Sequence, residues 1–235
     1  MSPTDNSWLT DNIIFVGPSR IQQLQDGHFF DALLQPFGLD TMAQQYFSIP
    51  VTPSWHLMNV IRRAAASDVP NSYEGIWHDI LMVFAVTGRA KQTSHRFTVR
   101  IEGVGSQQDW LIEATIQRDE QGFPFIFLAL VDNPPNALGT DHDIRFDAGH
   151  VVMTTGAAAL KTDFFPYLTR HLQGDWGELD AFDKRQNETA VSHHARILSA
   201  YDVATDVMTE ATTARIWIIT EANRAVTTIL TPDEY

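Results

Sequence analysis

Twice along this chain of 235 residues, apolar side chains at helical spacing give way to apolar side chains that alternate with polar ones. In the first half, the helical spacing ends near Gly88, and residues 95–102, HRFTVRIE, then alternate with a period of two. A period near 3.6 predicts an amphipathic helix, whereas a period of two predicts a half-buried strand. Helices followed by strands indicate an α+β fold.

The first half is expected to form helices and then a three-stranded antiparallel meander. Thr52 and Pro53 resemble an N-cap and first-turn pair, which predicts a helix that runs to about residue 66. The other helices are expected at residues 19–25 and 73–88, and the strands at residues 13–16, 95–102, 110–116 and 123–131.

The second half has a similar order of elements. Strands are expected at residues 149–154, 196–201, 215–220 and 225–230, and helices at residues 156–170, interrupted near Pro166, and 179–190. Each half is therefore expected to pack its helices on a small antiparallel sheet around a core of its own.

The most loop-like stretch, residues 132–141 with the sequence DNPPNALGTD, lies between the two halves. Asn-Pro, Pro-Pro and Gly favour turns and interrupt regular structure. The sequence therefore predicts an N-terminal module at residues 1–131, a linker at residues 132–145 and a C-terminal module at residues 146–235.

The closing residues 216–235 contain two apolar runs separated by residues 220–224, which predicts a hairpin. Asn223 suits a turn position with positive φ, and Pro232 is expected to end the last strand because it has no amide donor. The side chains expected to pack are Ile216, Trp217, Ile218 and Val226, and those expected to reach solvent at a sheet edge are Thr220, Glu221 and Arg224.

Composition limits the chemistry open to the chain. The absence of cysteine excludes disulfides, thiolate metal sites and cysteine nucleophiles. The nine histidines lack helpful metal-ligand spacing, and no phosphate-binding loop or dinucleotide fingerprint is present, so we expect no metal and no cofactor. No apolar run reaches the roughly 18 residues of a membrane span, and residues 1–5 do not resemble a secretion signal. A cytoplasmic location is therefore expected.

The charge of the chain constrains its partners. Twenty-nine acidic residues against sixteen basic ones give a formal net charge of −13. Such a field repels phosphates, so direct nucleic-acid binding, as by an accessory factor, is disfavoured. A basic surface on a partner protein is favoured instead, although solubility alone explains the charge equally well.

Three segments of the second half resemble a small uncharacterised protein family that is common on plasmids, integrative elements and phages: GDWGELDAFDKRQN, RILSAYDV and IWIITEANRAVTTILTPDEY. Some members are labelled as related to a restriction methylation subunit. The resemblance covers about residues 143–235, with residues 202–214 longer than the tight hairpin that the family leads us to expect. The segments DNIIFVGPSRIQQLQDG, GIWHDILMVFAV and FTVRIEG resemble a second uncharacterised mobile-element family. The resemblances imply mobile DNA and conflict with a host, and no particular activity.

We favour a non-enzymatic binding protein that inhibits a host defence or nucleic-acid-handling protein. The most specific version of this hypothesis is a DNA mimic of anti-restriction or anti-CRISPR type, in which surface carboxylates imitate phosphates. The residues expected to meet the partner are Asp175, Trp176, Glu178, Asp180, Asp183 and Glu188, and the acidic stripe would continue through Asp202, Asp206 and Glu210. Trp176 lies in a polar loop, where its ring either anchors the loop to the sheet or anchors the interface.

The alternative function is a metal-independent ribonuclease-like enzyme or its inactive remnant. His171 or Glu221 would then abstract a proton and Arg224 would steady the phosphorane, provided that His171 lies close enough to one of the other two to share a phosphate. A structural explanation competes with this, because a histidine near a helix C-terminus favours the helix dipole and Glu221 and Arg224 can form an ion pair. We therefore favour no catalytic residue.

Overall fold

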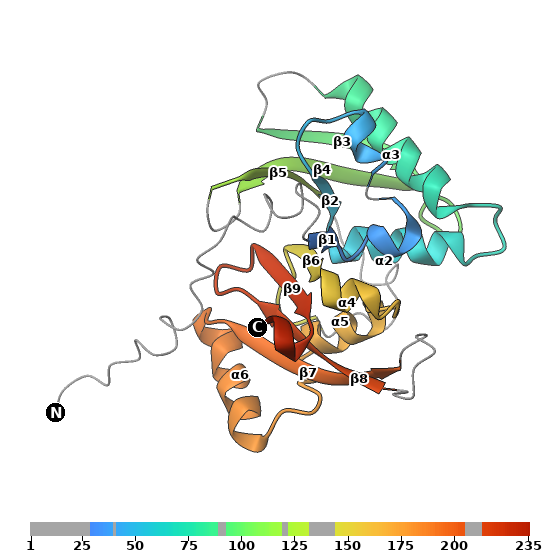
Figure 1. The fold of residues 1–235 in the computed structure, drawn as a ribbon. Coiled ribbons are helices and arrows are strands. Elements are labelled where there is room, and N and C mark those ends of the chain that lie inside the picture. The colour runs from blue at the N-terminus through green and yellow to red at the C-terminus, as the bar shows by residue number, and fades with distance from the viewer. Residues whose placement is uncertain (1–28, 40, 89–92, 119–121, 132–143, 205–212) are drawn as a thin grey trace.

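The computed structural model describes residues 29–39, 41–88, 93–118, 122–131, 144–204 and 213–235, and these residues form two mixed sheets with helices packed against them (Figure 1). The fold is thus α+β, as predicted. Residues 132–143 of the predicted linker at 132–145, the predicted strand at 13–16 and the predicted helix at 19–25 lie outside the described residues.

The first sheet has four strands in the order β2-β5-β4-β3. Their bounds are Val51–Pro53 for β2, Ser94–Arg100 for β3, Asp109–Arg118 for β4 and Pro124–Leu130 for β5. The antiparallel meander of β3, β4 and β5 confirms the prediction. The sheet also contains β2, which pairs with β5 in parallel, so the expectation of a purely antiparallel sheet is wrong.

Helix α2 covers Trp55–Ala65 and begins later than predicted. Thr52 and Pro53 lie in β2, and Ser54 caps the helix by accepting a hydrogen bond from the Leu57 amide at 3.2 Å. Proline tolerates this position because β2 is an edge strand. Helix α3 covers Tyr73–Thr87, as predicted, and packs against β3 and α2 (Figure 1).

The second sheet has five strands in the order β1-β6-β9-β8-β7. Their bounds are Phe29–Asp31 for β1, His150–Thr154 for β6, Ile197–Ala204 for β7, Thr213–Thr220 for β8 and Val226–Leu230 for β9. Strands β6 and β9 are parallel, and the other neighbours are antiparallel. The first half of the chain supplies β1, so this sheet is not built from the second half alone.

Three helices accompany the second sheet, and their bounds are Thr155–Ala159 for α4, Phe165–Leu172 for α5 and Ala181–His193 for α6. Pro166 stands in the first turn of α5, which explains the predicted interruption. The chain closes with a 3₁₀ turn at Pro232–Glu234, so β9 ends before the proline as predicted.

One hydrophobic cluster runs through both halves, which differs from the two separate cores that the sequence suggested. The Trp55 ring of α2 stacks on Phe165 of α5 at a centroid distance of 5.5 Å. The Phe125 ring of β5 lies 5.1 Å from that of His150 in β6. These contacts join the two sheets into one packed body.

The closing hairpin forms as predicted, with two differences. Arg224 takes the positive φ of 60°, and Asn223 instead accepts a hydrogen bond from the Ala225 amide at 3.0 Å. Thr220 is fully buried rather than exposed, because β8 lies between β7 and β9 and its end meets α5. Ile216, Ile218 and Val226 are buried as expected, and the Trp217 ring packs on Tyr235 at a centroid distance of 5.1 Å.

Candidate functional site

His171 lies in the last turn of α5 and is fully buried against the second sheet. Its Nδ1 contacts the Ser199 hydroxyl of β7, and its Nε2 lies 2.9 Å from the Thr220 hydroxyl of β8. The Thr220 hydroxyl lies 2.7 Å from that of Thr227 in β9, and Thr227 donates to the Ala148 carbonyl oxygen at 2.6 Å. A buried chain of hydrogen bonds thus crosses three strands.

The direction of this chain follows from its last acceptor. A carbonyl oxygen only accepts, so Thr227 donates to Ala148, Thr220 donates to Thr227, and His171 donates to Thr220 through Nε2–H. Nδ1 of His171 then accepts from the Ser199 hydroxyl. Burial, together with the smaller effect of the nearby Arg224 charge, lowers the pKa of His171 to about 3. His171 is therefore neutral at pH 7.

Arg224 and Glu221 both make contacts that hold the turn. The Arg224 guanidinium donates to the carbonyl oxygens of Ala190 at 3.1 Å and Ala195 at 2.8 Å, so it caps the C-terminal end of α6. The Glu221 carboxylate lies 3.2 Å from Nε of Arg196. The ion pair expected between Glu221 and Arg224 is thus replaced by one between Glu221 and Arg196.

His171, the base of the ribonuclease hypothesis, is thus closed off from a phosphate by its burial. His171 has no exposed surface, and its one acceptor nitrogen already receives a hydrogen bond from Ser199. A general base needs a free lone pair within reach of substrate. The arrangement is suited to holding α5 on the sheet.

Trp176 is 4% exposed, so its ring is not available as an interface anchor and instead fixes the loop. Its Nε1 donates to the Glu188 carboxylate of α6 at 2.8 Å. The next residue, Gly177, has φ 60° and lies so close to β7 that a Cβ would be 2.0 Å from the Ala200 carbonyl oxygen. The loop thus packs against the edge of the sheet, which is the first of the two alternatives that the sequence left open.

Half of the described carboxylates in the predicted stripe are engaged by arginines. Asp175 pairs with Arg170 at 2.7 Å, Glu188 with Arg145 at 2.8 Å and Asp202 with Arg215 at 2.8 Å. Each partner guanidinium helps lower the pKa of its carboxyl group. Asp206 and Glu210 lie outside the described residues, and the remaining acids are Glu178, Asp180 and Asp183, all exposed.

Phe182, which the sequence analysis passed over, stands 53% exposed in the first turn of α6. Asp180 caps this helix, and its Oδ1 accepts hydrogen bonds from the amides of Phe182 and Asp183, both at 2.8 Å. Phe182 therefore stands in the first helical turn together with two acidic residues, Asp180 and Asp183. An aromatic residue at the second position of a polar helix is the sequence signal that could have identified it.

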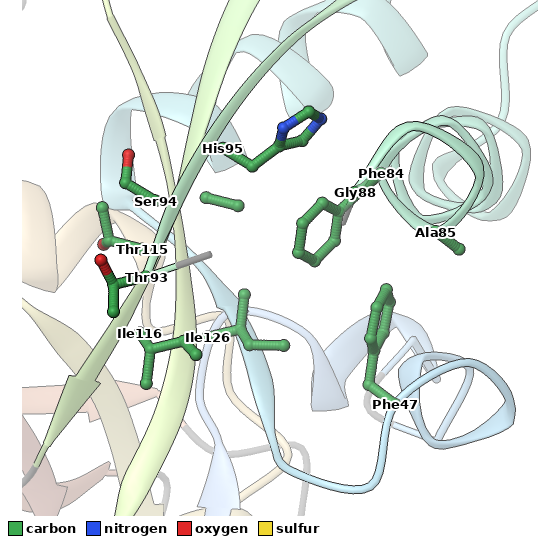
Figure 2. A pocket seen from close by; sticks show the side chains of 11 residues that line it. Phe47, Phe84, Ala85, Gly88, Thr93, Ser94, His95, Thr115, Ile116 and Ile126 are labelled. Atoms are coloured by element: carbon green, nitrogen blue, oxygen red, sulfur yellow. The ribbon is translucent and has the colours of Figure 1, made fainter. Parts of the chain in front are cut away.

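The first half contains an apolar cavity of about 230 Å³ between α3 and the sheet (Figure 2). Phe47 and Phe84 form one side and Ile116 and Ile126 the other. His95 lies at the rim, where its Nε2 is 2.9 Å from the Thr87 hydroxyl. These walls suit an apolar group. The cavity was not predictable from local patterns, because five separate segments build it.

No protein-family model, curated protein or solved structure matches this chain. Across the parts of the chain that the structure describes, no three His, Asp or Glu side chains gather where they could hold a metal ion. None of the described helices has the length and apolar content that crossing a bilayer requires.

Proposed function

We propose that this chain is a non-enzymatic binding protein that engages a basic surface of a partner protein through the first turn of α6. The observation that carries the proposal is Phe182, an aromatic side chain that is 53% exposed beside two exposed carboxylates, Asp180 and Asp183. Aromatic side chains surrounded by a polar rim are frequent anchors of protein interfaces.

The charge of the chain supports the same partner class. A net charge of −13 accelerates encounter with a basic surface, and the carboxylates around Phe182 set which surface fits. The buried, neutral state of His171 supports a non-enzymatic role.

The resemblance of the chain to mobile-element families supports a finer proposal, in which the partner is a host defence or nucleic-acid-handling protein in the cytoplasm. A DNA mimic needs a row of carboxylates with net negative charge. Because Asp175, Glu188 and Asp202 are each paired with an arginine, the negative charge of the described row is concentrated at Glu178, Asp180 and Asp183. We therefore propose a compact acidic docking site with an aromatic centre.

The test is capture of partners from bacterial lysate at low and at high salt. We expect Phe182→Ala and Asp183→Lys each to reduce the amount of a captured basic protein, and high salt to release it, because salt screens exposed charges. Two matched controls lie on α3: Glu74→Lys also reverses an exposed first-turn acid, and Val86→Ala also shortens an exposed apolar side chain. Neither should change capture.

Capture that Phe182→Ala and Asp183→Lys leave intact would contradict the proposed site. The enzymatic alternative is tested separately with purified protein and RNA in the presence of a chelator. We expect no cleavage, whereas cleavage that His171→Ala abolishes would restore the ribonuclease hypothesis.

A further inference from the structure

A cavity of about 550 Å³, larger than the one beside α3, lies where the two halves of the chain meet. A volume of this order suits a small organic molecule, and ligand sites are frequent between packed modules. The residues that line it come from both halves: the 3₁₀ turn at Gln35–Phe37, Arg62 of α2 and Tyr73 of α3 from the first, and Met153, Ala158 and residues 161–164 from the second.

The charged side chains of this lining are basic, in contrast to the chain as a whole. Arg62 and Lys161 contribute two positive charges against the one negative charge of Asp163, whereas the whole chain has a net charge of −13. A locally positive cavity on an acidic protein favours an anionic ligand, because the attraction acts against the repulsion from the rest of the surface.

Arg62 and Asp163 neutralise each other. The Arg62 guanidinium donates to both carboxylate oxygens of Asp163, at 2.8 and 3.4 Å, and its central carbon lies 4.4 Å from the centroid of the Phe165 ring. Lys161 is exposed and forms no ion pair with any carboxylate that the structure describes. Lys161 is therefore the positive charge that remains for a ligand.

Two uncharged polar groups accompany Lys161 in the lining. The Gln35 amide and the Tyr73 hydroxyl have no hydrogen-bond partner in the described parts of the chain. Neither is one of the buried side-chain atoms that lack a partner, so both are open to solvent and within reach of a ligand. Each can donate a hydrogen bond to an oxygen atom.

The apolar part of the lining includes a stacked pair of rings. Phe37 and Tyr73 both line the cavity, with their ring centroids 4.2 Å apart and their planes inclined by 19°. Aromatic walls favour a planar apolar group through ring–ring contact and through the burial of apolar area.

We propose that this cavity binds a small organic monoanion of the aryl carboxylate class, with its carboxylate at Lys161 and its ring against Phe37 and Tyr73. One negative charge matches the single unpaired lysine. The proposal does not rest on the docking site at α6, since the two involve different residues. Either can fail while the other holds.

The first experiment titrates the ¹⁵N-labelled full chain with benzoate or 2-naphthoate at low ionic strength and follows its amide signals by NMR. We expect at least one of the two carboxylates to bind saturably. The corresponding uncharged amide, benzamide or 2-naphthamide, should bind at least tenfold more weakly, because the charge-assisted contact is lost. The proposal is overturned if neither carboxylate binds, if the amide binds equally well, or if inorganic phosphate binds and the carboxylates do not.

The role of Lys161 is tested with Lys161→Gly. Lys161 has a φ of 52°, a left-handed conformation that glycine adopts with less strain, so this variant removes the charge and should also raise the Tm. We expect binding to weaken at least tenfold. His194→Gly is the matched control, because His194 has the same φ at the end of α6 and does not line the cavity. It should raise the Tm without changing the affinity, and unchanged affinity in Lys161→Gly would overturn the proposal.

The place of the ligand is tested with two leucine variants of α4. Ala158 lines the cavity, whereas the next residue, Ala159, is exposed and does not. We expect Ala158→Leu, which fills part of the cavity, to weaken binding of the carboxylate at least tenfold, and Ala159→Leu to bind as the unmodified chain does. Equal affinity in Ala158→Leu and the unmodified chain would place the ligand elsewhere and overturn the proposal.

Discussion

Nε2 of His171 lies 2.9 Å from Oγ1 of Thr220, and this contact is one step in a hydrogen-bond chain that runs in a single direction from Ser199 to the Ala148 carbonyl. Every hydroxyl hydrogen in the chain has an acceptor, so the network is satisfied only while His171 is neutral. A second proton on the ring would sit on Nδ1, where the Ser199 hydroxyl now donates. The group that looked most catalytic in the sequence thus holds α5 against β7, β8 and β9.

The first prediction concerns the pH dependence of stability. The pKa of His171 is about 3 in the folded protein and near its ordinary 6.5 in the unfolded chain, so the unfolded state binds the proton first as pH falls. The contribution of His171 to the free energy of unfolding is full above pH 6.5 and declines down to about pH 3. The decline is at most about 1.4 kcal/mol per pH unit.

Urea unfolding of the chain and of His171→Gln between pH 7.5 and pH 5 measures this contribution, since other titrating groups are common to both. We expect a smaller loss of stability with falling pH in His171→Gln than in the unmodified chain. His193→Gln, which removes an exposed histidine, should keep the full pH dependence. Equal pH dependence in all three proteins would show that His171 is not held neutral by burial.

The second prediction concerns Thr220. Thr220→Val keeps the shape of the side chain but removes the hydroxyl, which leaves the Nε2–H of His171 without its acceptor in a site of zero exposure. We expect the free energy of unfolding to fall by about 1–3 kcal/mol. Thr213→Val, at the exposed start of the same strand, should change it by less than about 0.5 kcal/mol. Similar effects at both positions would argue against the network.

Local patterns in the sequence predicted the elements well and their surroundings poorly. The alternation in residues 95–102 depends on one sheet face being buried, and β3 formed there. The parallel pairing of β6 with β9, in contrast, joins residues that are more than seventy positions apart, and no local period encodes it. For the same reason the sequence did not indicate that β1 completes the second sheet.

Exposure was harder to predict than secondary structure, because it depends on what packs on a residue from elsewhere in the chain. Thr220 looked like the polar end of a strand, but α5 covers it. For Trp176 the sequence left two alternatives open, and the contacts agree with an anchor of the loop, since its indole donates to Glu188 of α6 and Gly177 bridges to β7. Phe182 looked unremarkable in a helix, yet it is the aromatic side chain that reaches solvent there.

The third prediction concerns Glu234 near the C-terminus. Its carboxylate accepts hydrogen bonds from the Thr154 hydroxyl at 2.5 Å, the Gly156 amide at 2.7 Å and the Thr231 hydroxyl at 2.7 Å. Burial is the largest single effect and raises the pKa of Glu234, but the hydrogen bonds together lower the pKa below its ordinary value near 4.5. Their contribution to stability is therefore present above pH 4.5 and is lost as the pH falls through the lowered pKa.

At pH 7, we expect Glu234→Ala to reduce the free energy of unfolding by about 1–3 kcal/mol, because the partly buried donors of Thr154 and Gly156 lose a charged acceptor. Asp233→Ala, in the same turn and exposed, is the matched control and should have little effect. Thermal unfolding of both variants measures the difference. A loss in Asp233→Ala as large as in Glu234→Ala would mean that the turn, and not the carboxylate contacts, matters.

The last prediction returns to residues 132–145, where the sequence predicts a linker. We expect limited proteolysis to cut first between these positions, because the Pro-Pro stretch favours an extended loop. The two fragments should nevertheless stay together, since β1 pairs with β6 and the Trp55 ring stacks on Phe165 within one hydrophobic cluster. Size-exclusion chromatography of the nicked protein in native buffer should therefore give one peak at the mass of the intact chain, and two peaks should appear only in denaturant. Fragments that separate in native buffer would restore the two independent cores that the sequence suggested.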